Sequence, residues 1–188
     1  MDSDLTLDFI IIIVLIIANG LFSMTELAIV NAKKRKLEEL AEAGNERAKK
    51  AFELAENPND MFSTIQIGIT LVGILTGLYS GATFSSPLEE ILTANIPSIE
   101  PYAASVSSFL IVAIITYLSL VIGELVPKRL ALNSPEGIAV VVAKPIYWLS
   151  VALKPIVSFL GISTEFLLKI LGVTVKEEAP VTESEINK

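Results

Sequence analysis

Apolar residues gather in three long runs along this chain, and charged residues are almost confined to the segments between them. Residues 61–88 and 101–123 contain no charged side chain, and residues 9–32 contain a single one, Glu26. Each run is long enough to cross the hydrocarbon core of a membrane, which needs roughly 20 residues of helix. We therefore predict an all-α membrane protein. Its three transmembrane helices are expected at about residues 9–32, 61–85 and 101–126.

The segment between the first two runs has a different pattern. Charged residues alternate there with apolar ones such as Leu37, Ala51 and Leu54 at helical spacing, which predicts an amphipathic helix on the cytosolic side. The sequence NPND at residues 57–60 then ends this helix before the second run begins.

Residues 137–173 are also apolar, but two lysines, each followed by a proline, interrupt them. Their longest uncharged run is 10 residues, which is too short to cross a membrane. We predict a juxtamembrane helical belt that is interfacial or re-entrant, with Tyr147 and Trp148 at the level of the lipid headgroups and Lys144 and Lys154 reaching toward water. A fourth crossing is the alternative.

The basic residues predict the orientation of the crossings. All 14 Lys and Arg residues lie within residues 33–50 and 128–188, whereas residues 1–8 and 89–100 carry acidic side chains and no base. Cytoplasmic loops of membrane proteins are enriched in Lys and Arg. We therefore expect a multi-pass protein of the plasma membrane with its N-terminus outside and its C-terminus in the cytosol. The net charge of −7 is then a property of the ends and loops.

Composition narrows the chemistry. Hydrophobic residues make up 52% of the 188 residues, and the chain has no cysteine and no histidine. Disulfides and the usual zinc, copper or haem ligands are therefore excluded, and any metal site must be built from oxygen atoms, which suit Mg²⁺, Ca²⁺ or Na⁺. Without His, Cys or a positioned nucleophile, a hydrolase that uses Glu26 and Glu124 as a carboxylate pair is disfavoured, and we expect no enzyme.

Polar residues inside the runs fall on one face of each predicted helix. The inner members of the three faces occupy overlapping depths, roughly 5–15 Å from the cytosolic side at about 1.5 Å of rise per residue. The faces consist of Asn19, Ser23 and Glu26 in the first run; Ser63, Gln66 and Thr70, with Thr64 and Gly68 beside them, in the second; and Ser105, Ser108, Thr116, Ser119, Gly123 and Glu124 in the third.

Each of these polar residues also has a structural explanation. Ser and Thr in membrane helices usually bond to their own backbone or to a neighbouring helix, and either glutamate would be satisfied by pairing with Lys33 or Lys128 at the membrane surface. The joint pattern of three polar faces and two carboxylates at similar depth favours a shared cation pocket that opens to the cytosol.

Three glycines in the second run, Gly73, Gly77 and Gly81, form two overlapping GxxxG motifs. Small residues at this spacing let helices approach closely. Packing against another helix of the same chain and packing against a second copy both fit the motif.

Two motifs carry a resemblance to a known family. The N-x-L-F-S-x-x-E element from Asn19 to Glu26 and the G-E-x-x-P-K element from Gly123 to Lys128 resemble the transmembrane domain of the CNNM/CorC magnesium transport proteins. The resemblance implies three crossings, a juxtamembrane belt and a homodimer over residues 1–173, followed by a cytosolic pair of CBS domains that binds ATP. Residues 174–188, with a capping box from Thr182 to Glu185, would begin the linker to that pair, which is absent from this chain.

The resemblance also implies a pocket for dehydrated Mg²⁺, an ion that takes about six oxygen ligands at roughly 2.1 Å. Many relatives have Gly-Asn where this chain has Gly68 and Ile69, so an amide ligand available to them is absent here. Pro127 should distort the end of the third crossing and free carbonyl groups near Glu124. The implied metal ligands are Asn19, Ser23, Ser63, Thr64, Gly68, Thr70 and Glu124, with Glu26, Gln66, Pro127 and Lys128 as gating or supporting residues.

Two functions fit this pocket. In the first, the protein exports Mg²⁺ from the cytosol, with Na⁺ as the candidate coupling ion. In the second, the same pocket senses Mg²⁺ for a cytosolic domain or a partner channel, and no ion crosses. The resemblance favours transport. The expected partners are Mg²⁺, a second copy of the chain and the lipid bilayer, and no nucleic acid.

Overall fold

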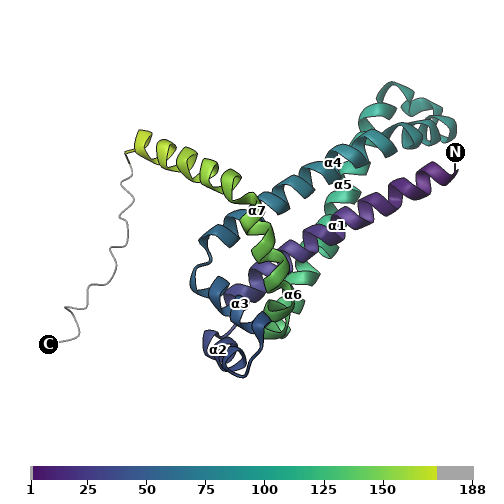
Figure 1. Cartoon of the computed structure of the whole chain (residues 1–188). Coiled ribbons are helices and arrows are strands. Elements are labelled where there is room, and N and C mark those ends of the chain that lie inside the picture. Colours follow the sequence, from purple (N-terminus) through teal and green to yellow (C-terminus); the bar gives the residue numbers. More distant parts are fainter. Residues whose placement is uncertain (1, 173–188) are drawn as a thin grey trace.

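The computed structural model describes residues 2–172, with side chains from Leu5 onward, and every secondary-structure element in that part of the chain is a helix. In Figure 1 the long helices α1, α4 and α5 run side by side, α2 and α3 lie at one end of this bundle, and α1 begins at the other. The elements are α1 (Asp2–Asn31), α2 (Lys34–Glu42), α3 (Glu46–Glu56), α4 (Asn59–Asn95), η1 (Pro97–Tyr102), α5 (Ala103–Leu120), η2 (Val121–Leu125), α6 (Val126–Asn133) and α7 (Pro135–Ile170).

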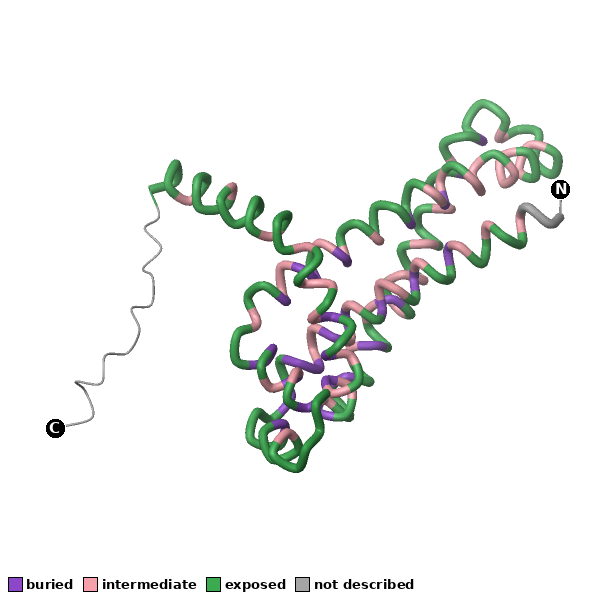
Figure 2. The backbone as a smooth tube through the Cα atoms, viewed as in Figure 1, coloured by how far each residue is buried: buried purple, intermediate pink, exposed green. Residues whose placement is uncertain are grey.

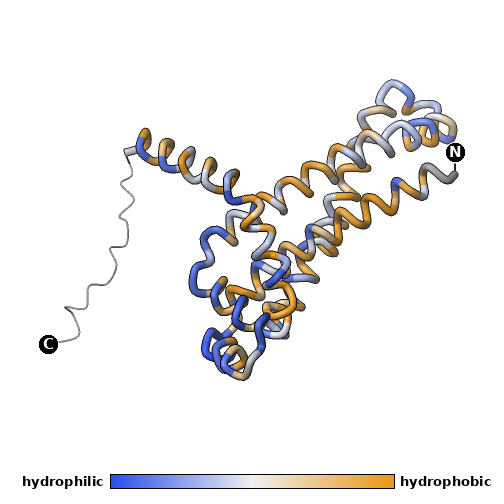
Figure 3. Tube along the Cα trace, viewed as in Figure 1, coloured by the Kyte–Doolittle hydropathy of each residue, from blue (hydrophilic) through white to orange (hydrophobic). Residues whose placement is uncertain are grey.

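Four helical segments in the described part of the chain are long and apolar enough to cross a membrane: Leu5–Asn31, Asn59–Asn95, Pro97–Asn133 and Pro135–Ile170. The first three contain the three predicted crossings. The fourth is α7, which covers the predicted belt as one helix with Pro145 and Pro155 inside it. In Figure 3, orange hydrophobic residues predominate along much of the bundle and recur along α7 between hydrophilic ones.

The second helix extends beyond the predicted crossing at about residues 61–85. Helix α4 continues to Asn95 and contains Pro87. A proline removes only one backbone hydrogen bond and does not always end a helix. The charges of Glu89 and Glu90 mark the end of the apolar run, and therefore of a crossing, but they do not stop helix formation.

The prediction of a single amphipathic helix between the first two runs is wrong. The segment forms two helices, α2 and α3. The chain turns at Gly44, whose φ of 89° lies in the left-handed region that glycine adopts readily. Asn45 then caps α3, since its side-chain oxygen accepts hydrogen bonds from the backbone N–H groups of Arg47 and Ala48 at 3.0 and 3.1 Å.

The hydrophobic core lies at the end of the bundle where α2 and α3 pack, as the buried positions in Figure 2 show. It joins the C-terminal end of α1, the α2–α3 pair, the start of α4 and the first part of α7. Beyond Ile146 no residue of α7 is buried, and the second half of this helix projects from the bundle in Figure 1. The core residues are Ile29, Ala32, Leu37, Ala51, Leu54, Ala55, Met61, Ile65, Ala139, Ala143 and Ile146.

The GxxxG glycines of α4 do not pack within the chain. A β-carbon added to Gly73, Gly77 or Gly81 would meet no atom within 4 Å. The buried face of this part of α4 carries Thr76 and Ser80 instead. Packing inside one chain therefore does not explain the motif in the part of the protein that the structure describes.

Candidate cation site

Helix α1 meets the third apolar segment at backbone distance. A β-carbon added to Gly20 would lie 2.9 Å from Cγ of Pro127, and one added to Gly123 would lie 3.2 Å from the carbonyl oxygen of Ile16. Both positions are tighter than ordinary side-chain contacts, so this crossing requires glycine on both helices. The sequence elements that carry the two motifs are therefore brought together in space.

The third segment changes its winding at this crossing. Residues Val121–Leu125 form the π-helical turn η2, which ends two residues before Pro127. Since proline has no N–H, the carbonyl four residues earlier, that of Gly123, loses its α-helical partner. The side-chain nitrogen of Asn19 donates a hydrogen bond to this carbonyl oxygen at 3.0 Å. The expected effect of Pro127 on carbonyl groups near Glu124 agrees with this geometry.

The other end of the Asn19 amide carries an unsatisfied oxygen. Its Oδ1 atom is buried and has no hydrogen-bond partner among the described residues. Such an atom is rare, because burying an acceptor without a partner costs free energy. Ser23 follows one turn further along the same face of α1 and is 2% exposed. Asn19 thus lies beside the π-turn that contains Glu124, and Ser23 offers a second neutral oxygen on the same face of α1.

Glu124 is paired with a base in this structure. Its Oε1 atom lies 2.8 Å from Nζ of Lys128, one helical turn away, and the two side chains are 39% and 36% exposed. Glu26 is half-buried and has no ion pair in the described part of the chain. The interpretation of Glu124 as a carboxylate paired with Lys128 is therefore confirmed, and a pairing of Glu26 with a base is not seen among these residues.

The predicted ligands on α4 are divided between two faces. Thr64 is fully buried, and its hydroxyl donates to the carbonyl oxygen of Asp60 at 2.7 Å. Gly68 lies against the ring of Phe22, since an added β-carbon would be 2.6 Å from its Cζ atom.

The remaining α4 positions lie elsewhere. Ser63 is half-buried, whereas Gln66 and Thr70 are exposed. In the third segment Ser105, Ser108 and Thr116 are exposed too. The close crossing thus gathers residues of α1 and the third segment and leaves these positions outside it. No group of three or more carboxylates occurs within the described residues, so a cation site here would combine one carboxylate with neutral oxygens.

The half of the bundle away from α2 and α3 contains an apolar cavity. A cavity between α1, α4 and α5 begins at the level of Ile16 and Ile122, and every residue that lines it is apolar. At the end of the cavity farthest from the helix crossing, the rings of Phe9 and Phe84 lie 4.7 Å apart. Nearby, the hydroxyl of Tyr79 donates a hydrogen bond to a carboxylate oxygen of Asp8. The full lining is Phe9, Ile12, Ile13, Ile16, Ile17, Phe84, Ile111, Ile114, Ile115, Leu118 and Ile122.

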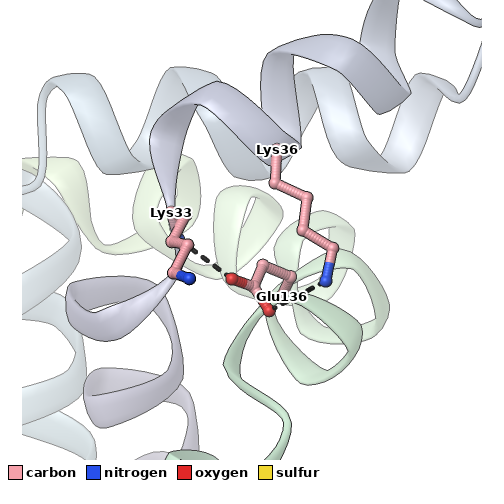
Figure 4. Close-up of polar contacts among 3 residues, drawn as sticks. All are labelled: Lys33, Lys36 and Glu136. Carbon is pink, nitrogen blue, oxygen red and sulfur yellow. Dashed lines mark hydrogen bonds and ion pairs between the residues drawn. The ribbon is translucent and has the colours of Figure 1, made fainter.

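A buried carboxylate on α7 was not among the predicted site residues. Glu136 is 9% exposed and accepts hydrogen bonds from the backbone N–H of Lys33 at 3.3 Å and from Nζ of Lys36 at 3.4 Å, as Figure 4 shows. Helix α2 has no side-chain cap and no acidic residue in its first turn, so Glu136 supplies the negative charge that favours a helix N-terminus. The signal in the sequence is Ser-Pro-Glu at residues 134–136, typical of a helix start.

These features define a multi-pass helical membrane protein in which α1 crosses the third apolar segment at a close, glycine-dependent contact with polar groups. The model of the family described as the cyclin M transmembrane N-terminal domain matches residues 10–188. The chain belongs to this family.

Several curated proteins are similar to the chain. UPF0053 protein sll0260 of Synechocystis sp. is 50% identical over 98% of this chain and 41% of its own length. UPF0053 protein YugS of Bacillus subtilis is 33% identical over 96% of this chain and 42% of its own. Polyamine export protein of Escherichia coli K12 is 28% identical over 94% of this chain and 39% of its own. The chain thus spans about two fifths of the length of these relatives.

Proposed function

We propose that this chain is the membrane domain of a cation exporter and that Mg²⁺ is the ion it carries. The observation that carries the proposal is the buried, unpaired Oδ1 atom of Asn19, held beside the π-turn of Glu124 by the bond from the same amide to Gly123. A cation or a water molecule would satisfy this acceptor oxygen. The family of magnesium transport proteins that the chain resembles supports the choice of ion.

The donor set suits Mg²⁺. This ion prefers oxygen ligands and gives up its water reluctantly, so a site that removes water from it needs a negative charge and rigid neutral oxygens. Glu124 supplies the charge, and Asn19 and Ser23 supply oxygens from a helix that cannot shift away, because Gly20 packs on Pro127. Lys128 is the residue that releases Glu124 when the ion arrives.

The proposed orientation places the polar crossing toward the cytosol. The basic residues of α2, α3 and α6 lie inside, and the apolar cavity with its Phe9–Phe84 and Asp8–Tyr79 contacts closes the outer half. We assign three crossings and place α7 along the inner surface of the plasma membrane, since Lys144 and Lys154 are exposed on it. The longer relatives leave room for the expected nucleotide-binding CBS pair after this domain.

The proposed assembly is a homodimer. The α4 face with Gly73, Gly77 and Gly81 has no neighbour among the described residues, and small residues at this spacing suit a second helix. Gln66 and Thr70 lie on the same exposed face by helical spacing. A second copy would therefore approach next to the predicted α4 ligands.

The test is Mg²⁺ flux from liposomes that contain the full-length protein, with and without an opposing Na⁺ gradient. Glu124→Gln should lower the flux at least tenfold, because the variant keeps the shape of the side chain but loses its charge. Glu56→Gln, on the exposed surface of α3, is the matched control and should keep it. Normal flux in a correctly folded Glu124→Gln protein would contradict the proposal. Saturable Mg²⁺ binding without flux would favour the sensor instead.

A polyamine is the second candidate cargo. The relative from Escherichia coli is named a polyamine export protein, and a polyamine is also a cation that a carboxylate attracts. The same liposomes loaded with labelled spermidine separate the two. Export of Mg²⁺ that spermidine does not compete with supports the first candidate, and the reverse result supports the second.

A further inference from the structure

A polar cavity lies away from the helix crossing, between α3, the start of α4 and the middle of α7. It has a volume of about 260 Å³ and shares no lining residue with the candidate cation site. Acidic, basic, aromatic and hydroxyl side chains all face it. The lining is Glu53, Leu54, Asn57, Asp60, Met61, Tyr147, Ser150, Val151 and Lys154.

Two opposite charges in this cavity are left without a protein partner. Glu53 is already paired with Nζ of Lys50, which also lies 4.0 Å from the ring centre of Tyr147. Neither Asp60 nor Lys154 forms an ion pair with any residue that the structure describes. Both residues are exposed to solvent, so the cavity offers one hydrated carboxylate and one hydrated ammonium group.

A buried hydroxyl in the same cavity also lacks a partner. The Oγ atom of Ser150 is buried and makes no hydrogen bond within the described part of the chain. A serine in a helix commonly bonds to the carbonyl four residues before it, as Thr64 does with Asp60. Ser150 does not, so its hydroxyl would gain a partner if neighbouring side chains moved to admit a phosphate oxygen.

The cavity lies where a membrane surface is expected. Asp60 directly precedes the apolar run that begins at Met61. Trp148, next to the cavity on α7, is 67% exposed, and the helix continues with exposed apolar residues such as Val151 and Phe159. Trp and Tyr favour the boundary between headgroups and acyl chains. A lipid can therefore reach the cavity from the surface of the membrane.

We propose that this cavity binds the headgroup of phosphatidylethanolamine, with the ammonium group on Asp60 and the phosphate on Lys154 and the Ser150 hydroxyl. A zwitterion with three ammonium N–H donors matches the two separate charges. Phosphatidylcholine has no N–H on its nitrogen, and phosphatidylglycerol has no positive charge for Asp60. The exposed apolar face of α7 takes the acyl chains. The site is independent of the proposed transport function.

The test is native mass spectrometry of the purified full-length protein in detergent with added phosphatidylethanolamine, phosphatidylcholine or phosphatidylglycerol. Phosphatidylethanolamine should bind at least tenfold more tightly than the other two. Asp60→Asn and Lys154→Gln should each weaken it about tenfold, the effect of losing one charge-assisted hydrogen bond. Lys169→Gln, near the far end of α7, is the control and should leave binding unchanged.

Ser150→Ala keeps the test informative if a charge variant folds poorly. The substitution removes a buried unpaired hydroxyl, so the melting temperature of the lipid-free protein should stay or rise. The rise in melting temperature that phosphatidylethanolamine produces should become smaller. Equal binding of phosphatidylcholine, tight binding of phosphatidylglycerol that depends on Lys154 alone, or displacement of the lipid by spermidine would overturn the proposal.

Discussion

The two halves of the helix bundle use the same helices in opposite ways. In the half next to α2 and α3, glycines let α1 and the third segment touch, and Asn19 bridges them through the carbonyl of Gly123. In the other half, an apolar cavity lies between α1, α4 and α5, and the rings of Phe9 and Phe84 line its far end. The difference indicates that the close crossing holds polar groups that the apolar cavity does not offer.

The largest effect is expected from a substitution that disrupts the contact between α1 and the third apolar segment. Gly20→Val should destabilise the protein by about 1–3 kcal/mol or more, because the added side chain overlaps Pro127 in a tightly packed contact. The matched control is Gly161→Ala on α7, where an added β-carbon meets nothing within 4 Å. Thermal unfolding in detergent measures both. Equal melting temperatures of Gly20→Val and the unchanged protein would show that the two helices do not touch there.

The next prediction tests the hydrogen bond from Asn19 to Gly123 separately from the packing of Gly20 on Pro127. Asn19→Leu keeps the size of the side chain but leaves the carbonyl of Gly123 without its donor, which should cost about 1–3 kcal/mol. It also removes the unpaired oxygen, so added Mg²⁺ should no longer raise the melting temperature. A variant that is destabilised but still stabilised by Mg²⁺ would place the ion elsewhere.

A smaller effect tests whether the apolar cavity between α1, α4 and α5 acts as the proposed barrier on the outer side. The chain has no cysteine, so a single introduced cysteine reports access without background labelling. Ile115→Cys, in the apolar cavity, should react slowly with a membrane-impermeant maleimide added outside. Adding Phe84→Ala should speed this reaction at least tenfold, because a large ring that lines the far end of the cavity is gone. Fast labelling with Phe84 in place would contradict the barrier.

The smallest effect lies outside the comparison of the two halves and shows how firmly α7 is tied to them. Glu136→Gln weakens the contacts with Lys33 and Lys36 and should lower stability by about 1 kcal/mol. Glu38→Gln, exposed on α2, is the control. If both variants melt alike, the contact drawn in Figure 4 contributes no measurable stability.

Helix positions inside the apolar runs could be predicted from the sequence, because length and the absence of charge determine what can cross a membrane. The effect of Pro127 on the helix end was also predictable, since a missing N–H must leave a carbonyl free. The end of α4 was not, because charges mark the membrane surface and Pro87 is tolerated in the helix. The turn at Gly44 shows the same limit, as one glycine divides an apparently continuous amphipathic pattern.

The site was predictable in its chemistry more than in its geometry. Helical spacing places Asn19 and Ser23 on one face, and their depth matches that of Glu124. Which face of α4 turns toward α1 depends on packing between distant residues, above all Phe22 against Gly68. The periodicity of one helix does not show which neighbouring helix a face packs against. The contact between Glu136 and Lys33, which are more than a hundred residues apart in the sequence, could not be predicted for the same reason.

Calorimetric titration of Mg²⁺ into the purified full-length protein tests the central claim most directly. We predict one site per chain, with binding lost in both Asn19→Leu and Glu124→Gln and kept in the control Glu56→Gln. Binding that both variants retain, in protein that unfolds at a normal temperature, would show that the inner helix crossing is not the cation site.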